Sequence, residues 1–335
     1  MVQRVKRLSC LSKTFIKSMS IFFSKMGETT LIEIDNLIKK FGKKLVLDRI
    51  NLKINKGEFL GIVGLSGSGK TTLLNILVGF WDPSIGKITF NGKDITKERM
   101  FFKQIFGFAT QAGSVYPQLT VEENLEYFGR LFNMRSSDID MRTEILLDLV
   151  ELTGANKVLA GELSTGMQRR LDIACALIHN PRVLIMDEPT EDLDPVLRKE
   201  LLALLKKIND EGTTIIMTSH LLNDLETVCD RIAILHNGYL VDVDSPTNLK
   251  GKYSQNEEIH LVTEPGRYDL WVKKLDCVRV SKAIIKPDKL ILYTPDSEIV
   301  LNDILKIIAM QREKLIDLKV TRPTMEEIFE AVTKR

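Results

Sequence analysis

The chain contains 335 residues, of which 44% are hydrophobic and 27% are charged. This composition is typical of a globular protein, and the length allows about two domains. The formal net charge of +2 gives no general argument for nucleic acid as a partner. Every apolar stretch is shorter than the roughly 18 residues of a membrane-spanning helix, so we expect membrane contact only through the surface or through another protein.

The cysteines and histidines are widely scattered along the chain. None has the CxxC or His–Cys spacing of a metal site, so the sequence predicts no zinc centre. A long chain with few, distant cysteines is typical of a reduced, intracellular protein. The four cysteines are Cys10, Cys175, Cys229 and Cys277.

Residues 1–28 form a basic N-terminal extension. Positions 1–25 contain basic but no acidic side chains, and apolar residues recur there at helical spacing. Three interpretations stay open. The segment is a helix on an anionic membrane surface, an organellar transit peptide, or an extension ahead of a true start at Met26.

Two alternating segments follow, from Thr30 to Phe59, and predict antiparallel strands with turns near Lys43 and Asn55. Phe41, just ahead of the next motif, is either an aromatic platform for an adenine ring or a residue of strand packing. The Asn91-Gly92 pair further on predicts a second hairpin.

Residues 58–80 read EFLGIVGLSGSGKTTLLNILVGF, which predicts a strand, a glycine-rich loop and a helix. The loop matches the GxxxxGK[ST] pattern, in which backbone N–H groups and a helix N-terminus surround phosphate oxygens. Lys70 adds a positive charge, and the Thr71 hydroxyl suits a phosphate-bound Mg²⁺. The predicted nucleotide-binding residues here are Gly64, Leu65, Ser66, Gly67, Ser68, Gly69, Lys70, Thr71 and Thr72.

The middle of the chain predicts mostly helices. A short strand over residues 106–110 ends at Gln111. Thr120, with Glu123 three residues later, is a helix start signal for residues 119–132, and helices continue through residues 143–152. A Ser-Thr-Gly turn then opens a long helix.

Two acidic residues follow an apolar strand in the segment RVLIMDEPTEDLDP. The carboxyl end of such a strand is where open α/β sheets bind ligands. Asp187 can hold Mg²⁺ there, and Glu188 can accept a proton from the water that attacks a γ-phosphate. The next strand, TTIIMTSH, brings His220 to the same edge.

Beyond Asn248 the pattern changes to a smaller unit. Strands are expected over residues 257–263, 278–294 and 316–321, and helices over 268–275, 299–314 and 324–334. With two strands in the 278–294 segment, this is a βαββαβα order, which predicts a small α+β domain.

From Leu31 to Asn248 these motifs, in this order, resemble the nucleotide-binding subunit of an ABC transporter. GLSGSGKTT is similar to its phosphate loop, LSTGMQ to its signature sequence, VLIMDEP to its catalytic strand and EDLDP to its D-loop. Thr165, the Glu191-Asp192 pair and Phe41 depart from the commonest forms, but no departure removes a group needed for hydrolysis.

The resemblance implies a P-loop NTPase of α/β class with an antiparallel β subdomain and a helical subdomain near residues 112–165. It divides the chain into the 1–28 extension, an ATP-binding domain at 29–250 and a C-terminal α+β domain at 255–335. Two such subunits would stack head to tail and enclose ATP. The implied catalytic residues are Glu188, His220 and Gln111; the implied Mg²⁺ ligands are Thr71, Gln111 and Asp187; further nucleotide contacts are Phe41, Ser164, Gly166 and Asp194.

The last segment, RPTMEEIFEAVTKR, resembles the end of subunits that serve drug, polysaccharide or antibiotic export. The resemblance implies an ATPase that powers export through a separate multi-span permease, which itself contacts the small-molecule or polymer substrate. The subunit would be peripheral, on the cytoplasmic face of the cell membrane, and paired with an identical or sister subunit. The alternative is a soluble ABC ATPase that acts on ribosomes or nucleic acid, although one phosphate loop and no heptad repeat count against it.

Overall fold

The structure is a computed structural model that describes residues 30–97, 102–253, 257–269, 279–321, 325–326 and 329. The basic extension predicted for residues 1–28 lies outside this part. The described chain contains three sheets, of six, four and four strands. It groups into two compact units. The first unit comprises the segments up to Glu58, Thr71–Met186 and Leu204–Ile216; the second comprises Phe59–Lys70, Asp187–Ala203 and the chain from Met217 onward.

An antiparallel sheet belongs to the first unit. Its strands pair in the order β2-β1-β4-β5. The predicted hairpin of the first two strands is confirmed, and buried apolar residues such as Ile32 and Ile54 face each other across it. Asn91 and Gly92, with φ of 48° and 77°, make the tight turn of the second hairpin, as predicted. The strands are β1 (Thr30–Phe41), β2 (Lys44–Asn55), β4 (Ile85–Phe90) and β5 (Lys93–Asp94).

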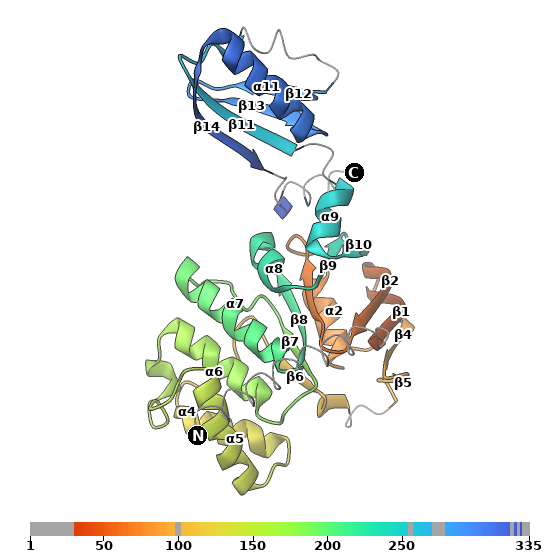
Figure 1. The fold of residues 1–335 in the computed structure, drawn as a ribbon. Coiled ribbons are helices and arrows are strands. Elements are labelled where there is room, and N and C mark those ends of the chain that lie inside the picture. The colour runs from red at the N-terminus through yellow and green to blue at the C-terminus, as the bar shows by residue number, and fades with distance from the viewer. Residues whose placement is uncertain are drawn as a thin grey trace, which may run out of the picture. The chain divides into compact units, whose positions relative to one another are not determined.

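Helices α4, α5 and α6 lie beside one another in the first unit (Figure 1). The capping box predicted for Thr120 and Glu123 is present at the start of α4. α5 is longer at its start and shorter at its end than the predicted 143–152 helix, because Glu151 adopts the left-handed conformation, with φ of 59°, and stops it. The helices are α2 (Lys70–Leu77), α4 (Val121–Leu131), α5 (Ser136–Leu149) and α6 (Thr165–Leu177).

The six-stranded sheet has the strand order β10-β9-β3-β8-β7-β6. Every residue of β3, β7 and β8 is buried, which is typical of parallel strands that are covered on both faces. β3 runs parallel to β9, β6 runs parallel to β7, and β10 is antiparallel to β9. The strands are β3 (Phe59–Val63), β6 (Phe106–Ala109), β7 (Val183–Met186), β8 (Thr214–Ser219), β9 (Arg231–His236) and β10 (Tyr239–Asp244).

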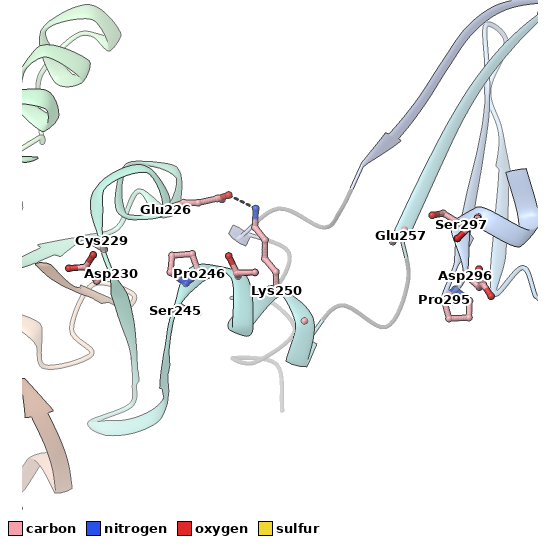
Figure 2. Close-up of a pocket in the computed structure, with 13 residues that line it drawn as sticks. Glu226, Cys229, Asp230, Ser245, Pro246, Lys250, Glu257, Pro295, Asp296 and Ser297 are labelled. Atoms are coloured by element: carbon pink, nitrogen blue, oxygen red, sulfur yellow. Dashed lines mark hydrogen bonds and ion pairs between the residues drawn. The ribbon is translucent and has the colours of Figure 1, made fainter. Parts of the chain in front are cut away.

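Three further helices follow β7, β8 and β10 in sequence: α7 (Pro195–Asp210), α8 (Leu222–Val228) and α9 (Pro246–Tyr253). Lys250 on α9 forms an ion pair with Glu226 on α8 and so ties these two helices together (Figure 2). None of the helices in the described ranges is both long enough and apolar enough to cross a membrane.

The C-terminal sheet is antiparallel, with the strand order β12-β13-β11-β14. Helix α11 packs on one face, where Ile259, Leu292 and Ile304 are fully buried. This confirms the strands and the helix predicted for residues 257–321, although the helices predicted at 268–275 and 324–334 lie largely outside the described residues. The elements are β11 (Glu257–Glu264), β12 (Lys282–Ile285), β13 (Leu290–Thr294), α11 (Ser297–Gln311) and β14 (Lys314–Thr321).

Candidate functional site

The buried strand β3 leads directly into the glycine-rich loop, and α2 begins at Lys70. Gly67 and Gly69 have φ of 78° and 109°, a conformation that side chains rarely allow. At Gly64, a Cβ atom would lie 2.4 Å from both the Leu235 carbonyl oxygen and the Ser68 hydroxyl. The loop backbone therefore has the close, side-chain-free curvature that suits an anion at a helix N-terminus.

Two polar side chains of this loop, Lys70 and Ser68, are buried. The Lys70 ammonium is buried and donates to the Gly64 carbonyl oxygen at 2.8 Å. The Ser68 hydroxyl is buried and has no hydrogen-bond partner. Buried polar atoms normally have hydrogen-bond partners. A buried hydroxyl without one, beside a buried ammonium, therefore fits a site that binds phosphate oxygens.

Asp187 and Glu188 follow the fully buried β7. Thr218, on β8, holds both. Its hydroxyl donates to Asp187 Oδ1 at 2.6 Å and accepts from the Glu188 N–H at 2.9 Å. Because all three residues are almost fully buried, these hydrogen bonds fix the direction in which the acidic pair leaves the strand.

The Glu188 carboxylate lies between two cationic or ionisable groups. Its Oε1 is 3.2 Å from the Lys70 ammonium, and its Oε2 is 2.8 Å from His220 Nδ1. The His220 N–H also donates to Oε2, at 3.1 Å. Glu188 itself has φ of 48°, so its backbone is in the left-handed region that a non-glycine residue seldom occupies. Such outliers cluster at functional sites, and here one places a carboxylate beside the phosphate-loop lysine.

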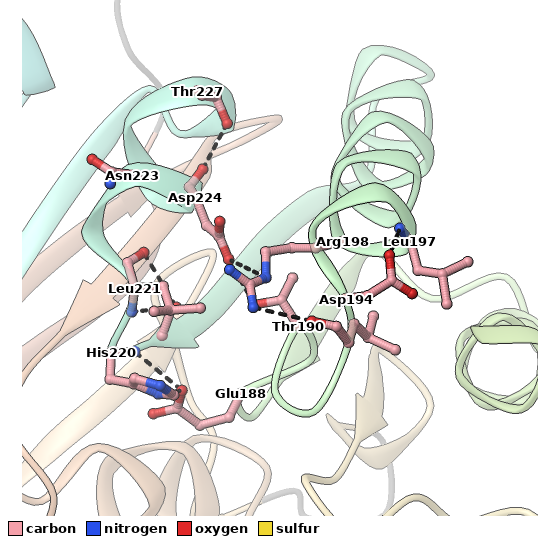
Figure 3. A network of polar contacts seen from close by, with 12 residues as sticks. Glu188, Thr190, Asp194, Leu197, Arg198, His220, Leu221, Asn223, Asp224 and Thr227 are labelled. Carbon is pink, nitrogen blue, oxygen red and sulfur yellow. Dashed lines mark hydrogen bonds and ion pairs between the residues drawn. The ribbon is translucent and has the colours of Figure 1, made fainter. Parts of the chain in front are cut away.

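A second network joins the D-loop to helix α8 (Figure 3). The Thr190 hydroxyl donates to Asp224 Oδ2 at 2.9 Å, and Arg198 Nε lies 3.8 Å from the same oxygen. Burial raises the pKa of Asp224, and the hydrogen bond from Thr190 and the charge of Arg198 partly oppose this rise. Asp194 caps α7 by accepting from the N–H groups of Val196 and Leu197.

Five further predicted site residues belong to the first unit. Phe41 is exposed, contacts the edge of Trp81 with ring centroids 5.1 Å apart, and has the Lys39 ammonium 4.8 Å above its ring. Ser164 caps α6, with its hydroxyl accepting from the Met167 N–H at 3.3 Å, and Gly166 is buried in the first turn. Thr71 and Thr72 continue from Lys70 into α2.

Gln111 follows β6, and its surroundings include residues that the sequence analysis did not identify. Arg169, on α6, donates to the carbonyl oxygens of Thr110 and Gln111, both at 3.0 Å. Asp172, one turn further along, accepts from the Ser114 N–H at 2.8 Å. The helix that starts with the signature sequence therefore holds the loop that contains Gln111.

Thr218, Arg169 and Asp172 are thus positioning residues that sequence reasoning missed. The sequence contains a weak signal for Thr218. It lies two residues before His220, and residues i and i+2 of a strand point to the same face. Arg169 and Asp172 carry none, because only the packing of α6 against residues 110–114 gives them their role.

The geometry of the phosphate loop and the acidic pair defines the class of protein. A lysine-bearing phosphate loop after a buried strand, with an acidic pair at the end of another strand, is the site of a P-loop nucleoside triphosphatase. Residues 47–191 match the sequence profile of the family described as "ABC transporter".

Relatives and solved structures agree with this class. The linearmycin resistance ATP-binding protein LnrL of Bacillus subtilis is 31% identical over 307 residues, 91% of this chain and 99% of that protein. The Nod factor export ATP-binding protein I of Burkholderia lata is 35% identical over 215 residues, 64% of this chain and 71% of that protein. A structure of cbiO1 from Clostridium perfringens, part of the ABC transporter complex cbiONQ, matches with a TM-score of 0.63 at 27% identity over 67% of this chain and 92% of that one.

The chain belongs to the ATP-binding subunits of ABC transporters. It is an ATPase subunit of that family, and the predicted resemblance to export-type subunits is confirmed by these relatives. The relatives named above are transporter subunits, and none of them is described as acting on ribosomes or nucleic acid.

Proposed function

We propose that this chain hydrolyses Mg·ATP at the cytoplasmic face of the cell membrane and thereby drives export of a small molecule or a polymer through a separate permease. The proposal rests on one observation: the Glu188 carboxylate contacts both Lys70 of the phosphate loop and His220. Support for export comes from the match over 99% of a relative named for linearmycin resistance and from the match to a Nod factor export protein.

Glu188 is the general base in this proposal. Its carboxylate would accept a proton from the attacking water, and His220, already hydrogen-bonded to it, would orient it and contact the γ-phosphate. In the present arrangement Lys70 is paired with Glu188. A bound phosphate would compete for the Lys70 ammonium and so release the carboxylate to act as a base.

Mg²⁺, when bound, would neutralise negative charge on the β- and γ-phosphates. The Thr71 hydroxyl, the Asp187 carboxylate and the Gln111 side-chain amide offer the oxygen ligands that this ion prefers. Thr218 would keep Asp187 oriented for that purpose, since its hydroxyl already donates to Oδ1.

Two copies, or this chain and a sister subunit, would share each ATP. Ser164 and Gly166 of one copy would offer a hydroxyl and N–H groups at a helix N-terminus to the γ-phosphate that the other copy holds. Phe41 would stack on adenine, with its exposed ring available for that contact. Asp194 would act indirectly, by fixing the start of α7.

The test is the Glu188→Gln variant of the full chain. We expect ATP hydrolysis to fall by about 10²–10⁴-fold, which is the usual contribution of a general base, while ATP binding persists and a dimer accumulates with ATP. Glu200→Gln, an exposed change on α7, is the matched control and is expected to retain activity. Unchanged turnover in Glu188→Gln would contradict the assignment of the base.

The export part is tested separately. The subunit purified from detergent-solubilised native membranes is expected to bring a multi-span permease with it in stoichiometric amount. Co-purification with ribosomal or nucleic-acid-associated proteins instead would leave the ATPase chemistry intact and overturn the transport assignment.

A further inference from the structure

β14 lies at the edge of the C-terminal sheet, beyond β11 (Figure 1). Among the described residues it pairs only with β11, so within that part of the chain no strand pairs with the backbone N–H and C=O groups on its other side. The strand is eight residues long and nearly all exposed, whereas the strand at the opposite edge, β12, has four residues. An edge of this length is a template for a further strand.

The exposed side chains of β14 include apolar ones. Ile316 is 51% and Val320 is 40% exposed, and Leu318 between them is only partly covered by the core under α11. The pairing with β11 shifts register between Asp317 and Leu315, so Ile316 is the extra residue of a bulge and the regular part of β14 is the run from Asp317 to Thr321. Leu318 lies inside that run.

Asp317 and Lys319 lie on either side of Leu318 in this run and carry opposite charges. If a second copy of β14 pairs antiparallel about a two-fold axis at Leu318, Asp317 lies opposite Lys319 of the partner subunit, and this ion pair occurs twice. Opposite charges directly across two strands are favourable.

Charge also selects the register. Moving the axis by one residue toward the N-terminus places Asp317 opposite its own copy, and moving it the other way places Lys319 opposite its own copy. Like charges directly across a strand pair are unfavourable. Only the register centred on Leu318 therefore pairs both charges with opposite ones, and it keeps the helix-bearing faces of the two sheets on the same side.

We propose that two copies of this chain join their C-terminal sheets through β14, in antiparallel register about Leu318, to form one continuous eight-stranded sheet. The interface is isologous, because the same strand contributes from each copy. It contains no nucleotide, so it holds two subunits together whether or not ATP is bound. It extends the dimer of the proposed function with a second contact, but it does not depend on hydrolysis.

A cysteine at the axis tests the register. In a full chain carrying Cys10→Ser and Cys277→Ser, Leu318→Cys is expected to form an intersubunit disulfide under mild oxidation without nucleotide, because residues directly across two strands have Cβ atoms about 5 Å apart. The two remaining cysteines, Cys175 and Cys229, are buried.

Leu315→Cys is the matched control. It lies on the same exposed strand, but the proposed register separates its two copies by about 20 Å along the strands, so it is expected to stay monomeric on a non-reducing gel. Failure of Leu318→Cys to cross-link, or equal cross-linking of both variants, would overturn the proposal.

A charge exchange tests the same contact without altering the partly buried Leu318. Asp317→Lys is expected to weaken nucleotide-free dimerisation by about tenfold, measured by sedimentation, because two attractive pairs become repulsive. The double variant Asp317→Lys with Lys319→Asp is expected to recover the wild-type dissociation constant. Asp303→Lys, an exposed change on α11, is the control and should have no effect.

The outcomes separate this interface from the ATPase site. A wild-type chain that is monomeric without nucleotide at every concentration, or a double variant that dimerises no better than Asp317→Lys, would overturn the β14 contact. ATP hydrolysis by these same variants reports on the proposed function independently, since none of the substituted residues belongs to the nucleotide site.

Discussion

Both carboxylate oxygens of Glu188 already have a partner, whereas a general base needs an oxygen that can contact water. One carboxylate oxygen pairs with Lys70 and the other with His220, in a nearly closed environment. A carboxylate held in such a buried ion pair is not available to water. In the proposed mechanism, nucleotide binding therefore has to displace Lys70 before Glu188 can act as a base.

This arrangement leads to a prediction for Lys70. Lys70→Ala removes the only cation that the loop itself contributes, so ATP binding measured by calorimetry is expected to weaken by at least tenfold. Lys70→Arg is the control for charge alone: the longer, forked guanidinium does not fit the short contact with the Gly64 carbonyl oxygen, so we expect incomplete rescue. Undiminished binding by Lys70→Ala would contradict the phosphate-loop interpretation.

Thr218 provides a second residue-scale prediction. Thr218→Val keeps the shape of the side chain but leaves Asp187 Oδ1 and the Glu188 N–H without their partner, so the chain is expected to lose about 1–3 kcal/mol of stability and much of its turnover number. Thr218→Ser, which retains the hydroxyl, is expected to stay near wild type. Thermal unfolding and ATPase assays measure the two effects, and equal behaviour of both variants would show that the hydroxyl is not needed.

At the scale of elements, the ends of α4 and α6 meet through one stacked pair. Phe132, at the end of α4, stacks on His179, just after α6, with ring centroids 3.5 Å apart. His179 Nε2 contacts the Phe106 carbonyl oxygen, and its Nδ1 is buried without a partner. Burial, together with the nearby charge of Arg142, lowers the pKa of His179 to about 4, although the hydrogen bond with the Phe106 carbonyl oxygen opposes this shift.

The depressed pKa predicts a pH dependence of stability. In the unfolded chain this histidine binds a proton near its ordinary pKa of about 6.5, whereas in the folded chain it does so only near pH 4. The unfolded state therefore binds more protons between these values, and stability falls as the pH falls from 6.5 toward 4. We expect a loss of about 1–2 kcal/mol between pH 7 and pH 5 from this residue.

Urea unfolding at the two pH values measures this loss. His179→Gln removes the titrating group and is the comparison: its difference in stability between pH 7 and pH 5 is expected to be smaller by that amount. The same pH dependence in both proteins would show that His179 does not carry it.

At the scale of the whole molecule, a change at the signature residue Ser164 can distinguish ATP binding by one subunit from dimerisation of two subunits. In a Glu188→Gln background, Ser164→Ala is expected to impair ATP-driven dimerisation while ATP binding to the monomer remains. The change also removes a helix cap, which costs about 1 kcal/mol. Thr120→Ala removes an equivalent cap from α4 and is the control for stability alone.

Sedimentation with and without ATP, together with ATP-binding titrations, measures the two steps. Equal losses of dimerisation in Ser164→Ala and Thr120→Ala would attribute the effect to the helix cap and not to a contact with nucleotide held by the other copy.

The sequence by itself determined much of this protein. The phosphate loop, the acidic pair after β7, His220, the antiparallel hairpins and the C-terminal strand order along the chain all follow from local patterns, because each needs particular residue types at a fixed spacing. These local rules also predicted the family that the relatives confirm.

Only the tertiary structure decided which groups meet. No spacing rule places Thr218 between Asp187 and Glu188, sets Lys70 against Glu188, or makes Arg169 hold the carbonyl oxygen of Gln111. The sequence likewise predicts β14 as a strand but does not tell that it lies at a sheet edge. These relations join residues far apart in the chain, and they are fixed by strand order and helix packing, which local residue patterns do not specify.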